Sequence, residues 1–167
     1  MAPKIAIRLA RIPEDAPELT SLLHQAYANL GAQGLNYTAV DQSVETTISR
    51  CEGGRCWAAE SENRLVGTIK LNEPDPDDDL FAYRDPEVGI INQFGVLPTF
   101  QGCGIGKALH DQAEIEAKRW GKSALVLDTA DSARDLIAYY ERLGYTVNGS
   151  VQWPGKTYRS VLMRKSL

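Results

Sequence analysis

The stretch that most constrains this chain is Gln101-Gly102-Cys103-Gly104-Ile105-Gly106, because it separates an apolar run from a helical pattern. The apolar run, Ile90 to Leu97, predicts a strand that ends at Pro98, and helical spacing begins near Gly104. Glycines let a backbone approach a phosphate closely, and the first N–H groups of a helix have no internal partner. The helix dipole also favours an anion there. Strand, glycine turn and helix therefore predict an anion-binding site.

Length and composition are those of one ordinary globular domain, and we expect residues 1–167 to form it. The chain is 43% hydrophobic and 24% charged, as is ordinary for a globular protein. Its net charge of -4 gives no excess of positive charge that would indicate nucleic-acid binding. No apolar run approaches the roughly 20 residues of a membrane span. Apolar residues alternate in residues 1–11, which predicts a strand and no signal peptide. We expect a cytoplasmic protein without nucleic-acid or membrane partners.

Three cysteines, Cys51, Cys56 and Cys103, make an odd number. One C-x4-C pair without a nearby histidine does not match a zinc site. We therefore expect reduced thiols without a function, and no metal.

The remaining pattern alternates short apolar strands with amphipathic helices. We expect strands at 4–9, 57–60, 65–71, 90–97, 124–128, 145–153 and 158–164. We expect helices at 13–31, 41–50, 104–120 and 132–143, the first ending near Gly31 and the second capped by Asp41 or Ser43. The order βααβββαβαββ predicts an α/β fold, with a mixed twisted sheet and helices on both faces.

Two segments resemble the GNAT superfamily of N-acetyltransferases. Val96 to Leu109 is similar to the family's acetyl-CoA signature, (Arg/Gln)-x-x-Gly-x-(Gly/Ala) preceded by Val-x-Pro. Asp128-Thr129 and Ile137 to Tyr145 resemble its next strand and helix, and the order of elements is similar over almost the whole chain. The resemblance implies a GNAT-like sheet and an enzyme that uses acetyl-CoA as co-substrate, without a metal.

The resemblance also implies the residues that bind the co-substrate. Backbone N–H groups of one segment would hold the pyrophosphate, namely Gly102, Cys103, Gly104, Ile105, Gly106 and Lys107. Gln101 would tie this loop to a phosphate or to itself. Cys103 stands where members often have Lys or Arg, and Lys107 could replace that charge. The alternative for Gly104 and Gly106 is a plain turn with a helix cap.

In the family, the strand before this loop separates from its neighbour at a bulge. Its exposed backbone pairs with the pantetheine arm, a role that falls here on Phe94, Gly95 and Val96. A glycine inside a strand, such as Gly95, indicates a bulge or a close approach of another group. Many members also have an asparagine where Ala133 stands, so that contact is missing or comes from Ser132 or Arg134.

Tyr140 lies four residues before Gly144, at the position of the family's catalytic tyrosine. The leaving CoA thiolate needs a proton, which a nearby tyrosine hydroxyl supplies as general acid. The alternative is core packing, because Leu136, Ile137 and Tyr140 share a helix face. For Tyr139 we expect core packing.

Asp128 is the candidate general base that takes a proton from the attacking amine. Some members that acetylate protein N-termini have a glutamate twelve residues before the tyrosine, which is the Asp128 position. The alternatives are an aspartate that caps a helix or satisfies a loop, and a chain of waters without a dedicated base.

The resemblance implies direct attack of a primary amine on acetyl-CoA in a ternary complex. The acceptor is a small amine or amino acid, a polyamine, an antibiotic, or an amine of a peptide or protein. Trp153 lines its pocket or belongs to the core, and Asp75 to Asp79 form a solvated loop or steer a cation. Another class of function is a non-catalytic acyl-CoA-binding or regulatory module, which predicts binding without turnover. Dimers are common in the family, so a homodimer is one expectation.

Overall fold

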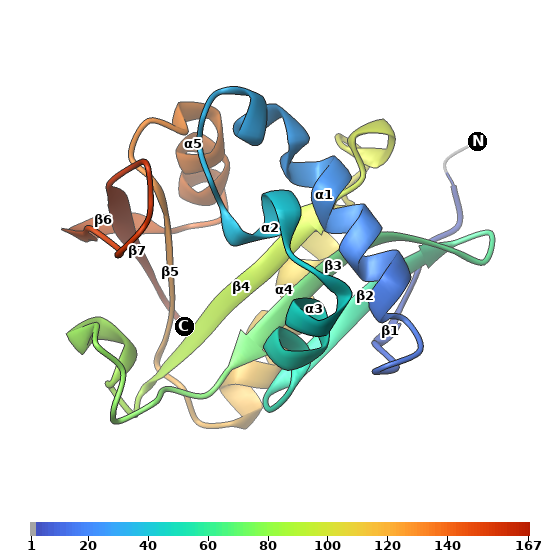
Figure 1. The fold of residues 1–167 in the computed structure, drawn as a ribbon. Coiled ribbons are helices and arrows are strands. Elements are labelled where there is room, and N and C mark those ends of the chain that lie inside the picture. The colour runs from blue at the N-terminus through green and yellow to red at the C-terminus, as the bar shows by residue number, and fades with distance from the viewer. Residues whose placement is uncertain (1–2) are drawn as a thin grey trace.

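The structure is a computed structural model that describes residues 3–167, so Met1 and Ala2 of the predicted domain lie outside the described residues. Seven strands form one sheet in the order β1-β2-β3-β4-β5-β7-β6 (Figure 1). The strands are β1 (Ala6–Leu9), β2 (Arg55–Ser61), β3 (Arg64–Asn72), β4 (Val88–Val96), β5 (Ala124–Ala130), β6 (Thr146–Val151) and β7 (Ser160–Ser166). Neighbouring strands are antiparallel except β4 and β5, which are parallel, so the predicted mixed sheet is confirmed.

Helices cover both faces of the sheet, as predicted. They are α1 (Ala16–Ala32), α2 (Thr38–Asp41), α3 (Val44–Cys51), α4 (Ile105–Arg119) and α5 (Arg134–Arg142), with 3-10 turns η1 (Phe81–Tyr83) and η2 (Pro98–Phe100). In Figure 1, α1 to α3 lie in front of the sheet and α4 lies behind it. The order differs from the predicted one only by α2, η1 and η2, which are too short to leave a periodic pattern.

Helix α1 ends at Ala32, close to the predicted end near Gly31, but the glycine that follows its C-cap is Gly34. Gly34 has φ +84°, and the N–H of Leu35 reaches back to the carbonyl of Leu30, as in a Schellman cap. Gly31 is needed for another reason: a Cβ there would lie 2.8 Å from Cγ1 of Val40. The glycine thus lets α2 pack against α1.

The N-terminus of α3 agrees with one of its two predicted caps. Ser43 is the cap, and its hydroxyl accepts a hydrogen bond from the N–H of Thr46 at 3.1 Å. Asp41, the other candidate, is the last residue of α2. Since Gln42 between them is extended, the predicted helix 41–50 corresponds to α3, and α2 is a separate short helix before it.

Strands β4 and β5 pair only at one end. Their three parallel pairs are Val88 with Ala124, Gly89 with Leu125 and Ile90 with Val126. Beyond Ile90 the two strands separate, as Figure 1 shows, while β4 stays paired with β3 and β5 with β7. The sheet therefore opens into a V-shaped gap in its middle.

His110 of α4 is fully buried and bonds to the hydroxyl of Tyr145 through Nε2 at 2.7 Å. Burial, aided by the charge of Lys165, lowers the pKa of His110 to about 4, so the ring is neutral near pH 7. Its Nδ1 lies 3.9 Å from a carboxylate oxygen of Glu114, a contact that is no ion pair in the neutral state. The histidine is thus a structural group of the core.

We expect His110 to make the fold sensitive to acid. The unfolded chain protonates this histidine near its ordinary pKa of 6.5 and the folded chain only near 4, so stability falls as pH drops through this window. The full difference is about 3 kcal/mol in the free energy of unfolding. Urea unfolding at pH 7 and pH 4.5 should show a smaller pH dependence in His110→Gln. His24→Gln is the control, and an equal change in both variants would contradict this assignment.

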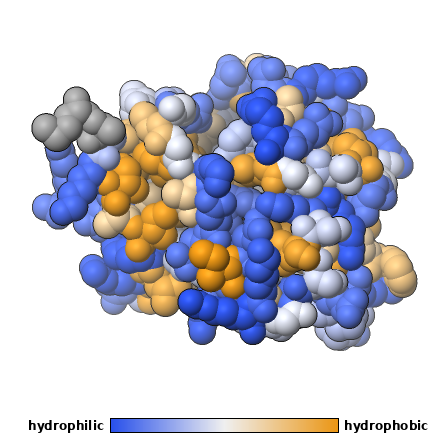
Figure 2. Space-filling model, turned by 180° about the vertical axis from the view of Figure 1, so that it is seen from behind, coloured by the Kyte–Doolittle hydropathy of each residue, from blue (hydrophilic) through white to orange (hydrophobic). Residues whose placement is uncertain are grey.

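The surface opposite to the view of Figure 1 is mainly hydrophilic, with hydrophobic residues in separate patches (Figure 2). The large exposed apolar side chains come from four different segments, Leu9, Phe81, Ile115 and Val147. Within residues 3–167, no helix has the length and apolar character needed to span a bilayer.

Of the cysteines, Cys51 and Cys56 are buried with their sulfur atoms 3.4 Å apart, and Cys103 is exposed.

Candidate active site

The gap between β4 and β5 begins at a bulge in β4. Gln93 and Phe94 of β4 face the single residue Ile69 of β3, and Gln93 has φ +46°, which is rare for a residue with a side chain. The Gln93 side chain is held by Gln42, whose Nε2 lies 3.0 Å from Oε1, and by Cys51 Sγ at 3.3 Å. The predicted bulge is therefore present, but at Gln93–Phe94 and not at Gly95.

Gly95 instead allows a close approach of α1. Its Cα faces that helix so closely that a Cβ would lie 3.1 Å from the Cβ of Ala26 and 3.6 Å from the ring of Tyr27. Gly95 is paired with Thr68 in the β3 ladder. Of the two predicted reasons for a glycine inside this strand, a bulge or the close approach of another group, the close approach is the one observed.

The backbone of Val96 faces the gap. Leu97 donates its N–H to Val66 on the β3 side at 2.8 Å, and alternation along a strand turns Val96 the other way. The Val96 carbonyl accepts from Gln101 Nε2 at 3.1 Å, and the Phe94 carbonyl accepts from the Tyr27 hydroxyl at 2.8 Å. Gln101 thus ties the loop to β4, and the N–H of Val96 faces the gap without a ladder partner on β5.

The glycine turn has the conformation of an anion cradle. Gly102 and Gly104 have φ +78° and +81°, values that only glycine adopts easily, and Gly104 is the cap of α4. The N–H of Ala108 is the first to bond inside the turn, to Gly104 O, so the amides of residues 105–107 keep no helical acceptor. An anion at this helix start meets aligned N–H groups and the positive end of the dipole.

A groove of about 680 Å³ runs from this turn to the gap, and it fits a long phosphate-bearing molecule. It is lined by the predicted residues Phe94 to Val96, Gln101, Gly102 and Gly104 to Lys107, whereas the exposed side chain of Cys103 does not line it. Lys107 is paired with Asp111 at 2.6 Å, so its charge is partly neutralised. Arg134 and Arg142 of α5 supply further positive charge. From the sequence, Arg134 was predicted as a possible replacement for the family's asparagine contact, but Arg142 was not predicted as a groove residue.

Gly106 brings α4 close to α5. A Cβ at this position would lie 2.4 Å from the hydroxyl oxygen of Tyr139, but 3.5 Å from the ring carbon that bears it. We expect Gly106→Ala to lower stability by about 1–3 kcal/mol, and Tyr139→Phe to restore most of the loss because it removes the clashing oxygen. Thermal melting of the single and double variants measures this coupling. Additive effects of the two substitutions would contradict it.

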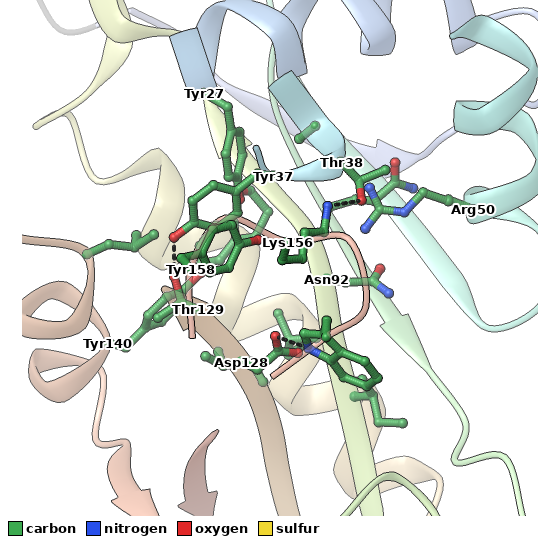
Figure 3. A pocket seen from close by; sticks show the side chains of 18 of the residues that line it. Tyr27, Tyr37, Thr38, Arg50, Asn92, Asp128, Thr129, Tyr140, Lys156 and Tyr158 are labelled. Atoms are coloured by element: carbon green, nitrogen blue, oxygen red, sulfur yellow. Dashed lines mark hydrogen bonds between the residues drawn. The ribbon is translucent and has the colours of Figure 1, made fainter. Parts of the chain in front are cut away.

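A second cavity of about 350 Å³ lies on the other side of the gap (Figure 3). The two cavities share four residues, Tyr27, Phe94, Leu136 and Tyr140. Tyr140 is only 5% exposed, and its hydroxyl makes no hydrogen bond to another residue of the range 3–167. Burial raises the pKa of this hydroxyl well above its ordinary value, so it stays protonated. A protonated group without a partner thus lies where the two cavities meet.

Asp128 lines the second cavity near the end of β5. One carboxylate oxygen accepts from the Tyr83 hydroxyl and the other from Trp153 Nε1 at 2.9 Å. The cap of α5 is Ala133, without a side-chain bond, so Asp128 is not a helix cap. Trp153 therefore lines the pocket, and the carboxylate is held by two loops that follow β3 and β6.

Several residues of the second cavity were not predicted from the sequence, because their positions match no motif. The Tyr37 hydroxyl bonds to Thr129 Oγ1 at 2.8 Å and accepts from the N–H of Ala130 at 3.0 Å, which joins α2 to the end of β5. Arg50 at the end of α3 and Lys156 in the last hairpin loop also face the cavity. None of Asp75 to Asp79 lines it, so this acidic loop does not form part of the site.

One group of described residues, His110, Asp111 and Glu114, brings three possible metal-ligand atoms within 4.8 Å of one another. Asp111 is paired with Lys107, and Glu114 with Lys118 and Lys165. Because lysine ammonium groups already neutralise both carboxylates, this cluster is an ion-pair network.

Comparison with known proteins agrees with this geometry. The model of the Acetyltransferase (GNAT) family matches residues 18–145. Human N-acetyltransferase 8B is 31% identical over 114 residues, which are 67% of this chain and 47% of that protein, so the chain spans about half of that relative's length. The ribosomal protein bS18-alanine N-acetyltransferase of Haemophilus influenzae is 27% identical over 121 residues, 62% of this chain and 81% of that protein.

The fold has many solved counterparts. The PaiA N-acetyltransferase of Thermoplasma acidophilum, solved in complex with coenzyme A, superposes with a TM-score of 0.75 at 18% identity, covering 98% of this chain and 99% of that chain. This structural similarity supports the fold alone. The family model covers most of the chain and therefore shows the family. The glycine turn, the split sheet and the tyrosine between two cavities are thus features of a protein that belongs to the GNAT family of acetyltransferases.

Proposed function

We propose that this protein transfers the acetyl group of acetyl-CoA directly to a primary amine, with Tyr140 as general acid. The observation that carries the proposal is the unpartnered Tyr140 hydroxyl at the junction of the two cavities. Acetyl-CoA would lie in the larger groove, with its pyrophosphate at the amides of residues 105–107. The amine would lie in the smaller cavity beside Asp128. Both reactants would then meet at the gap without a covalent enzyme intermediate.

In the proposed reaction, Asp128 takes a proton from the ammonium form of the acceptor, and the free amine attacks the thioester carbonyl. The N–H of Val96 faces the gap and would polarise that carbonyl as charge develops on its oxygen. The C–S bond then breaks, Tyr140 gives its proton to the departing thiolate, and the attacking nitrogen loses its second proton to solvent as the amide forms. Solvent reprotonates the phenol through the cavity. Cys103 takes no part, because it is exposed and does not line the groove.

Acetylation of an amine panel tests the proposal. The purified protein is incubated with acetyl-CoA and amino acids, polyamines, aminoglycosides or short peptides, and acetylated products are detected by mass. We expect turnover of at least one class, and a raised melting temperature with acetyl-CoA. A raised melting temperature without any product would contradict catalysis and favour a non-catalytic binding module. Neither product nor shift would contradict the assignment of the co-substrate.

The cytoplasmic location and the homodimer remain predictions.

A further inference from the structure

The charges that line the smaller cavity are unusual for a site that accepts an amine. Arg50 and Lys156 carry two positive charges, and Asp128 carries the single negative one. A cavity with this balance repels a polyamine, which would bring several further positive charges. It favours a molecule that brings negative charge together with its amine.

Arg50 faces this cavity without a carboxylate partner. Its Nη1 donates to Gln42 Oε1 at 2.7 Å, and no carboxylate of the described chain lies within 4.0 Å of the guanidinium. Burial lowers the pKa of Arg50, because it removes water from the charged guanidinium. Gln42 also bonds to Gln93, so the guanidinium is fixed relative to the bulge of β4.

Lys156 lies near Arg50. Its ammonium donates to the carbonyl of Asn36 at 2.8 Å and to Thr38 Oγ1 at 3.2 Å, which leaves one of its three protons for a ligand. Burial and then the charge of Arg50 lower its pKa, and no carboxylate in residues 3–167 pairs with it. Two like charges held near one another are stabilised by an anion between them.

The two cations and the reacting groups lie on different sides of the cavity. Figure 3 shows the nitrogen atoms of Lys156 and Arg50 beside Thr38, while Asp128 and Tyr140 lie on the side of β5 and α5. A bound zwitterion can therefore place its carboxylate at one side and its amino group at the other.

Two loops that are bonded to each other border the cavity. Thr157 donates its N–H to Asn36 Oδ1 at 2.8 Å, and Asn36 Nδ2 donates to the carbonyl of Gly155 at 2.9 Å. The rings of Tyr37 and Tyr158 stack beside these contacts at 4.9 Å. Residues of both loops line the cavity, and its volume of about 350 Å³ favours a small free molecule over a protein chain.

We propose that the acceptor is an amino acid whose carboxylate binds between Arg50 and Lys156 while its amino group faces Asp128 and Tyr140. This inference rests on the proposed acetyl transfer and names its substrate class. A decarboxylated amine leaves both cations without an anion, and a methyl ester removes the charge while it keeps the shape. Each should therefore be a poor acceptor.

Matched acceptors test the inference. Rates of acetylation are compared for phenylalanine, phenethylamine and phenylalanine methyl ester, for methionine and 3-(methylthio)propylamine, and for spermidine and a peptide amide. We expect at least one amino acid to exceed its matched amine by about 10- to 100-fold in kcat/KM. Equal or better turnover of the decarboxylated amines, of spermidine or of the peptide overturns the inference and leaves acetyl transfer intact. No product from any acceptor overturns both.

Variants locate the carboxylate. Arg50→Gln and Lys156→Gln should each raise the KM for the amino acid about 10-fold or more, with a smaller change in kcat and little change for the matched amine. Arg64→Gln, which removes an exposed cation that lines neither cavity, is the matched control and should leave the acceptor KM unchanged. Lys156 lies in a hairpin loop, so its variant remains informative where Arg50→Gln fails to fold. Equal losses for the amino acid and the amine overturn the assignment.

Discussion

Tyr140→Phe should lower kcat for acetyl transfer by about 10²- to 10⁴-fold, the range of a general acid, while acetyl-CoA still binds. The substitution removes one hydroxyl that makes no hydrogen bond within residues 3–167, so the aromatic packing of Tyr140 against Phe94 and Tyr145 is kept. The loss should therefore appear in kcat and not in melting temperature. Steady-state kinetics, with the acetyl-CoA-induced melting shift measured in parallel, check both parts.

Tyr139→Phe is the matched control for this prediction. Tyr139 precedes Tyr140 on α5 and packs on the same Phe94 ring, but it lines only the larger groove. Removal of its hydroxyl should change kcat less than about threefold. A similar loss in both variants, or normal kcat in Tyr140→Phe, would remove Tyr140 from the mechanism and favour the core-packing interpretation.

Asp128→Asn should lower kcat/KM by about 10²-fold or more near pH 7, because the acceptor then lacks a base. At higher pH the amine loses its proton without help, so the difference between this variant and the parent enzyme should shrink. The rate of acetyl transfer from pH 7 to pH 10 measures this dependence. A constant deficit across that range would show that Asp128 acts by positioning alone.

A structural role of Asp128 is separated by a second variant. Asparagine has one carbonyl oxygen, so it keeps only one of the two hydrogen bonds from Tyr83 and Trp153. Trp153→Phe removes one of these bonds but leaves the carboxylate, and we expect a loss below about tenfold. An equal loss in Trp153→Phe would indicate that loop positioning explains the whole effect.

Prediction from sequence succeeded where the information is local. Strands and helices follow from the period of their apolar residues, and the glycine turn from residues that tolerate positive φ, as Gly102 and Gly104 do. The same local reasoning did not reveal why residue 31 is a glycine, because the requirement comes from Val40 of another helix. For Gly95 it left a bulge and a close approach open, and it gave no sign that the bulge lies at Gln93.

By itself the sequence determined the order of the longer elements, the glycine turn at the start of α4, and the family to which the chain belongs. Only the tertiary structure decided the smaller cavity, where Tyr37, Arg50 and Lys156 come together from three segments. The physical reason is that these contacts depend on the separation of β4 from β5 and on the loops packed over it. No local propensity encodes such distant pairings, and they set the charge of the smaller cavity.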